Sequence, residues 1–155
     1  MNWQEVVAHP GLRNLPFKIE LNEWGQIVMS PFKMARSIAQ GRITRLLPDA
    51  GQCLLSCAIR TPKGVKVADI AYASEARWQL IKHEAAASVA PEICVEVLST
   101  SNTTGEIAAK RDLYFAAGAE EVWTCNKKGV MKFYTSKGEI KQSHLVPDFP
   151  RNIGF

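Results

Sequence analysis

Short apolar runs, typical of strands, alternate along the chain with longer segments of helical periodicity. Strands are predicted at residues 17–21, 25–29, 52–60, 65–73, 92–99, 120–125, 130–135 and 139–145. Helices are predicted at about 31–47, opened by Pro31, at 75–90, followed by Pro91, and at 103–117, ended by Gly118. A short turn or helix precedes the first strand. This order predicts the α/β class, with a mixed central β-sheet flanked by helices.

Two acidic residues interrupt segments that otherwise have the pattern of buried strands. Asp69 lies in VKVADIAYA, and Glu96 lies in EICVEVLS, where both strand faces are otherwise apolar. An unpaired buried carboxylate costs several kcal/mol, so such residues need a partner or a metal ion. Two strand carboxylates are a suitable donor set for Mg²⁺ or Mn²⁺. The alternatives are that either acid pairs with a buried Lys or Arg, or faces water at a strand end.

A lysine lies on the apolar stripe of the helix predicted at residues 103–117. On a helical wheel, Lys110 falls in the middle of the stripe that faces the sheet. Glu106, one turn earlier, has the spacing for an ion pair with it. However, Thr103 and Glu106 also have the spacing of a capping box, which would turn Glu106 toward the helix start. The pattern therefore favours a lysine aimed at the two carboxylates.

Basic residues are concentrated in one part of the chain. The whole chain carries a net charge of +4, yet residues 24–68 contain seven basic residues and one acid. A basic segment beside a carboxylate site suits a polyanionic substrate, because neutralised phosphates supply most of the nonspecific affinity for nucleic acid. The alternative is a solvated basic face without a partner. The candidate nucleic-acid-binding residues are Lys63, Lys66, Arg36 and Arg42.

The length of 155 residues predicts a single domain, residues 1–155. No apolar run reaches the roughly 18 residues that a membrane span needs, and the N-terminus lacks the pattern of a secretory signal. A cytoplasmic location is expected. The four cysteines form no CxxC pair and are expected to be reduced, buried thiols. Cys53 and Cys57 are expected to share one face of a strand, about 13 Å apart.

Several of these segments together resemble a known family. VKVADIAYAS, APEICVEVLSTSN and EIAAKRDLYFAAGAEEVW resemble the Uma-two-type restriction-endonuclease-like proteins of the PD-(D/E)XK nuclease superfamily. FKIELNEWGQIVMSP resembles the opening of that group, and the whole resemblance covers roughly residues 14–150. The combination is specific, because the K-x3-Y-x3-G-x4-W tail has the family spacing. Its residues here are Lys110, Tyr114, Gly118 and Trp123.

The resemblance implies roles for four residues. Asp69 corresponds to the PD acid, Glu96 to the D/E acid, Lys110 to the motif lysine and Glu20 to the N-terminal acid. Asp69 and Glu96 would bind Mg²⁺ or Mn²⁺, Lys110 would orient water or stabilise charge on the phosphate, and Glu20 would orient Lys110 or help to hold a metal.

The chain departs from the family pattern at three places. Ala68 replaces the Pro of the PD pair, and Leu98 stands where the superfamily lysine would follow Glu96. The first long helix carries no histidine, although relatives often do, and Gln40 is the residue expected to take a polar role there. Loss of that histidine points toward reduced activity.

The resemblance implies a Mg²⁺-dependent endonuclease that hydrolyses phosphodiester bonds in DNA. One alternative is a catalytically weakened or inactive module of the same fold that binds nucleic acid or serves in assembly. Another is a scaffold or regulatory protein that forms a homodimer and binds neither metal nor nucleic acid.

Overall fold

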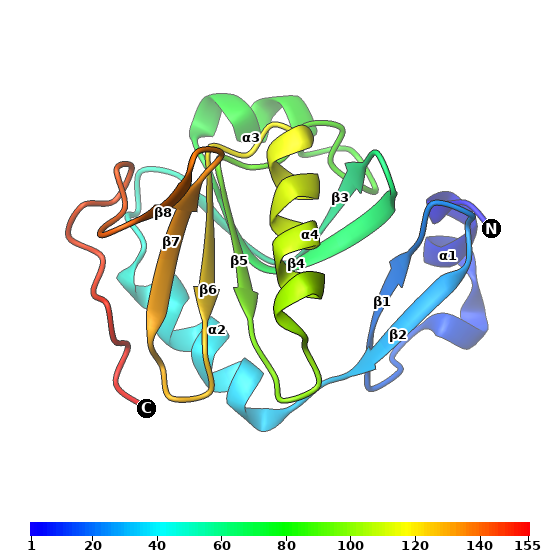
Figure 1. Cartoon of the computed structure of the whole chain (residues 1–155). Coiled ribbons are helices and arrows are strands. Elements are labelled where there is room, and N and C mark those ends of the chain that lie inside the picture. Colours follow the sequence, from blue (N-terminus) through cyan, green and yellow to red (C-terminus); the bar gives the residue numbers. More distant parts are fainter.

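The computed structural model describes all 155 residues and has a six-stranded sheet with the strand order β3-β4-β5-β6-β7-β8 (Figure 1). The strands are β1 (Phe17–Leu21), β2 (Ile27–Pro31), β3 (Gln52–Thr61), β4 (Gly64–Ala73), β5 (Ile93–Val97), β6 (Glu121–Cys125), β7 (Met131–Thr135) and β8 (Gly138–Ile140). The helices are α1 (Trp3–Ala8), α2 (Met34–Leu46), α3 (Glu75–Ile81) and α4 (Thr104–Ala116), with a 3-10 turn at Pro10–Leu12. Strands β5 and β6 are parallel and the other pairs antiparallel, so the predicted mixed α/β class is confirmed.

Helices cover both faces of the six-stranded sheet (Figure 1). Alternation along β5 explains this arrangement, because successive side chains point to opposite faces. Val95 packs with Ala39 and Ile43 of α2, whereas Cys94 packs with Tyr114 of α4. The near-continuous apolar character of β5 therefore reflects a strand that is buried on both sides. None of the helices combines the length and apolar character that crossing a membrane requires.

The central strands β4 and β5 separate toward one end of the sheet. Their pairing covers only Ile70–Tyr72 against Ile93–Val95. Strands β1 and β2 form a separate hairpin beside the diverging half of β4 (Figure 1). Gly64 permits this approach, because a Cβ at Gly64 would clash with the carbonyl oxygens of Leu21 and Asn22. The gap between β4 and β5 is thereby open to side chains from the hairpin.

The first long helix begins later than the sequence predicted. Pro31 does not open the helix but ends β2, where it pairs with Phe17, and α2 begins at Met34. Proline is tolerated at this position because β2 lies at the edge of a two-stranded sheet, where a missing N–H leaves no ladder bond broken.

Helix α3 is shorter than the helix predicted at residues 75–90, because it ends at Ile81. The chain that follows returns to β3. The Ala87 N–H donates to the Ala58 carbonyl at 2.8 Å, and the Arg60 N–H donates to the Ala87 carbonyl at 2.9 Å. Hydrogen bonds with the sheet thus replace those that would have continued the helix.

The last strand was also predicted wrongly, since β8 spans Gly138–Ile140 instead of 139–145. The N–H groups of His144 and Leu145 donate to the Glu121 carboxylate, each at 2.9 Å, rather than to a neighbouring strand. A side chain therefore satisfies the backbone that a strand would have paired.

All four cysteines are free. However, the prediction that Cys53 and Cys57 share one face is wrong. Cys53 packs against the core under α2, and Cys57 packs against the core under α4. Ser56 between them has φ of 51°, in the left-handed region, which interrupts the alternation of side chains along β3.

Candidate active site

Asp69 and Glu96 meet where β4 and β5 separate. Each places a carboxylate oxygen 3.1 Å from the same atom, the Nζ of Lys18. The second oxygen of Asp69 accepts the Val97 N–H at 2.8 Å, so a side chain takes the place of a ladder partner at this point. The two predicted acids are thus brought together around one cation, from strands that are neighbours in the sheet.

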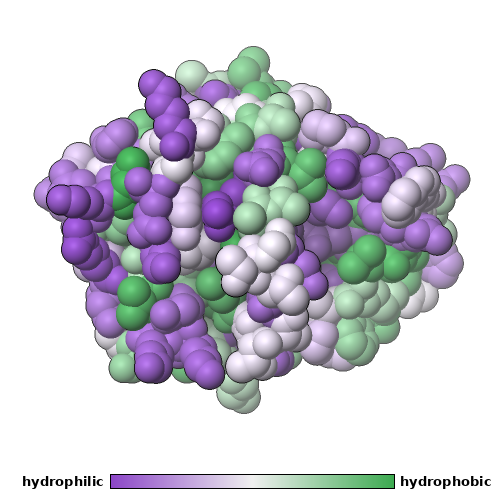
Figure 2. Space-filling model, viewed as in Figure 1, coloured by the Kyte–Doolittle hydropathy of each residue, from purple (hydrophilic) through white to green (hydrophobic).

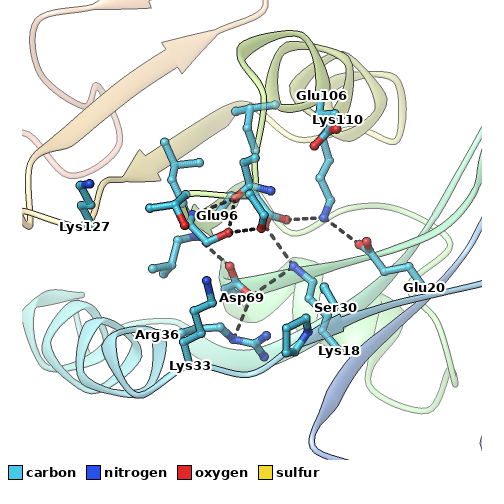
Figure 3. Close-up of a pocket in the computed structure, with 18 of the residues that line it drawn as sticks. Lys18, Glu20, Ser30, Lys33, Arg36, Asp69, Glu96, Glu106, Lys110 and Lys127 are labelled. Atoms are coloured by element: carbon cyan, nitrogen blue, oxygen red, sulfur yellow. Dashed lines mark hydrogen bonds and ion pairs between the residues drawn. The ribbon is translucent and has the colours of Figure 1, made fainter.

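Lys18 is the residue of the site that sequence reasoning missed. It comes from β1 and is 6% exposed, in the gap between the two carboxylates (Figure 3). Strand β1 alternates apolar and polar residues, and Lys18 and Glu20 share its polar face. That pattern is typical of a solvated face, and only the position of the hairpin against β4 makes the face buried.

Glu20 anchors the hairpin to the main sheet. Its Oε2 accepts the Val67 N–H of β4 at 2.7 Å and lies 2.8 Å from the Lys110 Nζ. The Val67 N–H needs such a partner, because β4 is no longer paired with β5 at this level. Glu20 therefore both fixes β1 in place and holds Lys110.

Lys110 extends from α4 toward the acids, as the helical wheel predicted. Its Nζ lies 3.2 Å from Glu96 Oε1 as well as close to Glu20 (Figure 3). Glu106 forms the capping box with Thr103 at the start of α4, which was the expected alternative to pairing with Lys110. Tyr114, one turn after Lys110, donates its hydroxyl to Glu96 Oε1 at 2.6 Å. Helix α4 thus fixes Glu96 through two side chains.

Helix α2 contributes to the site from the other side of Asp69. Arg36 Nε lies 3.1 Å from Asp69 Oδ1, and the guanidinium also stacks on the Phe32 ring at 4.0 Å. Gln40 Nε2 donates to the Asp69 carbonyl at 2.8 Å. The structure thus places Arg36, a predicted nucleic-acid-binding residue, in an ion pair within the site. Gln40 has the polar role expected of it in this helix.

The site balances three cationic side chains against three carboxylates. Burial and the neighbouring Glu96 raise the pKa of Asp69 to about 6, although Lys18, Arg36 and the Val97 N–H act in the opposite direction. Burial would also raise the pKa of Glu96, but Lys110, Lys18 and the Tyr114 hydroxyl lower it to about 2. Of the two acids, Asp69 is therefore the first to take a proton.

Lys110 remains a cation at any ordinary pH. Burial acts to lower its pKa, but Glu96 and Glu20 outweigh burial and raise the pKa above its usual value. Burial and Glu96 likewise hold the pKa of Tyr114 well above its usual value, so the phenol stays protonated. Lys66 differs, because burial lowers its pKa and Glu20 only partly compensates.

The ion pairs line a cavity of about 570 Å³. Hydrophilic side chains occupy the hollow between α4 and the β1–β2 hairpin (Figure 2). Lys33, Lys66 and Lys127 add positive charge to its lining, and Lys127 lies away from the ion pairs, across the cavity (Figure 3). Ser99–Asn102, between β5 and α4, supplies hydroxyl and amide groups. The acids thus lie in a cavity whose remaining charges are mainly basic.

The predicted nucleic-acid-binding residues do not all reach this cavity. Lys66 and Arg36 line it. Lys63 is exposed in the turn between β3 and β4. Arg42 donates to the Ile153 carbonyl at 3.4 Å and lies over the Phe155 ring, so it holds the C-terminal segment.

Comparison with known proteins identifies a family and a similar fold. Residues 3–150 match the family Uma2, described as "Putative restriction endonuclease". The fold is similar to the crystal structure of "a putative nuclease belonging to DUF820" from Anabaena variabilis, with a TM-score of 0.75. The two share 15% sequence identity, over 99% of this chain and 95% of that chain, so this likeness shows the fold alone. No curated protein matches the sequence.

Proposed function

We propose that this chain, which belongs to the Uma2 family, is a magnesium-dependent endonuclease that hydrolyses phosphodiester bonds in DNA. The family assigned from the sequence motifs is confirmed, and its description supports a nuclease. The observation that carries the finer proposal is the convergence of Asp69 and Glu96 on a single cation in a cavity with a basic lining.

The donor set fits a small hard cation. Mg²⁺ is commonly held by one or two carboxylates together with water and phosphate oxygens. Asp69 Oδ1 and Glu96 Oε2 already share the ammonium of Lys18, so the two oxygens are suitably placed to share a metal ion. The side chains include no cluster of three or more His, Cys, Asp or Glu residues suited to a metal, so water and substrate would supply the remaining ligands. When bound, the metal would polarise the phosphate and acidify a water molecule.

The protein side chains would position and stabilise the reacting groups. Lys110 stays protonated, so it would act as an electrostatic stabiliser of charge on the phosphate oxygens rather than as a base. Tyr114 holds Glu96 in orientation through its hydroxyl. Glu20 holds Lys110, and its bond to Val67 keeps that lysine aligned with β4.

The basic residues around the cavity would bind the nucleic-acid backbone. Lys33, Lys66 and Lys127 line the cavity and have no ion-pair partner within 4.0 Å, so their charges are free for phosphates. Lys63 lies in the turn that leads into β4 and would extend this surface. Arg36 and Arg42 are committed to Asp69 and to the C-terminal segment, and we assign them supporting roles.

A plasmid-nicking assay with Mg²⁺ or Mn²⁺ tests the proposal. Asp69→Asn and Lys110→Met should each reduce nicking by about 100-fold or more, since each removes a charge next to the reacting phosphate. Asp112→Asn, on the exposed side of α4, is the matched control and should retain activity. Nicking that is independent of metal, or unchanged in Asp69→Asn, would contradict the proposal.

One observation favours the alternative of a non-catalytic nucleic-acid-binding module of the same fold. Lys18, Arg36 and Lys110 already balance the three carboxylates of the site, so the fold requires no metal for charge balance. Such a module would bind DNA in the presence of a chelator and would show no nicking with either metal. Binding and nicking measured on the same preparation separate the two functions.

A further inference from the structure

We propose that Lys18 is a built-in counter-ion in the divalent-cation position, and that a metal ion binds to Asp69 and Glu96 only after the Lys18 ammonium has moved away. This inference rests on the proposed function, because it concerns how the same site would take up its metal. It assigns a specific role to a side chain that the sequence pattern places on an ordinary polar strand face.

The first argument is the identity of the oxygens that Lys18 contacts. Its Nζ lies 3.1 Å from Asp69 Oδ1 and 3.1 Å from Glu96 Oε2. The other Asp69 oxygen is bound by the Val97 N–H, and the other Glu96 oxygen is bound by Tyr114 and by Lys110. Of the two oxygens that Lys18 contacts, Glu96 Oε2 has no other partner, and Asp69 Oδ1 also lies 3.1 Å from Arg36 Nε. These are the oxygens that would hold a metal ion once the ammonium has left.

The second argument is electrostatic. Lys18 is 6% exposed, so its charge is poorly screened by solvent. A divalent cation bound at about 2.1 Å to oxygens that are 3.1 Å from the ammonium nitrogen would lie within about 5 Å of that nitrogen, so the two like charges would repel each other strongly. The two cations therefore exclude each other, and Lys18 lowers the metal affinity.

The third argument is that the cavity provides space into which the Lys18 side chain can move. The side chain lines the cavity of about 570 Å³, as does Ser30, its partner residue on β2. Glu20 keeps β1 bonded to β4 through the Val67 N–H, independently of Lys18. Rotation of the Lys18 side chain into the cavity would thus free Glu96 Oε2 and leave Arg36 as the one cation on Asp69 Oδ1, and the hairpin need not leave the sheet.

Isothermal titration calorimetry with Mn²⁺, on wild-type protein and on Lys18→Met, tests the competition between the metal ion and the Lys18 ammonium. Lys18→Met should bind Mn²⁺ at least about tenfold more tightly, because a competing charge has been removed. Lys66→Met is the matched control, since this half-buried lysine lines the cavity without contacting either acid, and its effect should be smaller. Equal affinities for the wild type and Lys18→Met would overturn the inference while leaving metal dependence intact. Absence of Mn²⁺ binding in both folded proteins would overturn the inference and the proposed metal dependence together.

Chemical acetylation of lysines in the wild-type protein provides a second test, which does not depend on whether a variant folds. In metal-free protein, Lys18 should react slowly with an amine-acetylating reagent, because it is buried between the acids. Saturating Mn²⁺ should increase its rate of modification about tenfold or more, as followed by peptide mass spectrometry, and leave that of exposed Lys137 unchanged. If Mn²⁺ binds and Lys18 stays protected, the ammonium has not moved and the inference fails.

Discussion

Two regions of this protein bury carboxylates, and the groups that bind the carboxylate oxygens differ between the two regions. In the candidate active site, Asp69 and Glu96 are held chiefly by charged side chains at the edge of a cavity. At the other region, Glu121 is 2% exposed and accepts four hydrogen bonds from uncharged groups. The donors are Trp123 Nε1, the Ser143 hydroxyl and the N–H groups of His144 and Leu145.

The difference indicates which carboxylates can exchange partners. One donor to Glu121 is the Trp123 indole on the same strand, and the others are the hydroxyl and backbone N–H groups of residues 143–145. Glu121 therefore anchors that segment to β6 and has a structural role. The partners of Asp69 and Glu96 include the end of a flexible lysine side chain that faces a cavity. A buried acid is therefore a candidate ligand when its partner can leave without breaking the fold.

The largest expected effect on stability is at Glu121. Glu121→Gln replaces one acceptor oxygen with an amide donor and removes the charge, so it should lower the free energy of unfolding by about 2–4 kcal/mol. Asp69→Asn should change it by less at pH 7, because burial already disfavours the Asp69 charge. Urea denaturation of both variants measures the difference. A greater loss in Asp69→Asn would assign the structural role to the site acids instead.

A pH titration of stability sharpens the same contrast. The pKa of Asp69 is raised to about 6, so between about pH 4 and 6 the folded state binds a proton that the unfolded state has released. Its contribution to stability is therefore greatest at low pH and falls as the pH rises through about 6, by about 2–3 kcal/mol in total. Denaturation in a chelator at pH 4 to 8 should show this decline relative to Asp69→Asn. A constant difference between the two proteins would contradict it.

A smaller effect is expected at Tyr114. Tyr114→Phe removes the hydroxyl that donates to Glu96 at 2.6 Å and should reduce stability by about 1.5–3 kcal/mol, the range for bonds to charged groups. The pKa of Glu96 should rise, because one of the groups that lower it has been lost. Tyr134→Phe is a suitable control, since the Tyr134 ring lies under Arg111, away from the acids. Equal stability of Tyr114→Phe and wild type would show that Lys110 and Lys18 are sufficient to orient Glu96.

The smallest effect is expected for the free energy of DNA binding when the two basic residues Lys63 and Lys66 are replaced. Lys63→Ala combined with Lys66→Ala should reduce the slope of log affinity for duplex DNA against log salt by about 1.8, or about 0.9 per phosphate contact. Metal affinity should change by less than in Lys18→Met. Lys137→Ala combined with Lys141→Ala, near β8 and outside the cavity lining, removes the same charge as a control. Equal slopes in the two double variants would mean that the cavity side of the protein does not bind the phosphates.

The sequence pattern was sufficient for the fold class and for three residues of the candidate site, and the family resemblance added a fourth, Glu20. Asp69, Glu96 and Lys110 were recognisable because a charge within an apolar pattern contradicts the periodicity around it. The capping box at Thr103 was predicted from its local spacing to Glu106, and the structure confirms it. Each of these inferences depends on residues that are close together in the chain.

Tertiary structure alone decided which cation lies between the acids. Lys18 is 51 residues from Asp69 and 78 from Glu96, and its alternating strand predicts a solvated face. It became buried because β4 and β5 separate N-terminal to Ile70 and C-terminal to Val95, and the hairpin fills the gap. Periodicity encodes which face of an element is apolar, but not which polar face another element will cover. That depends on how the elements pack, and here it determined the charge at the centre of the site.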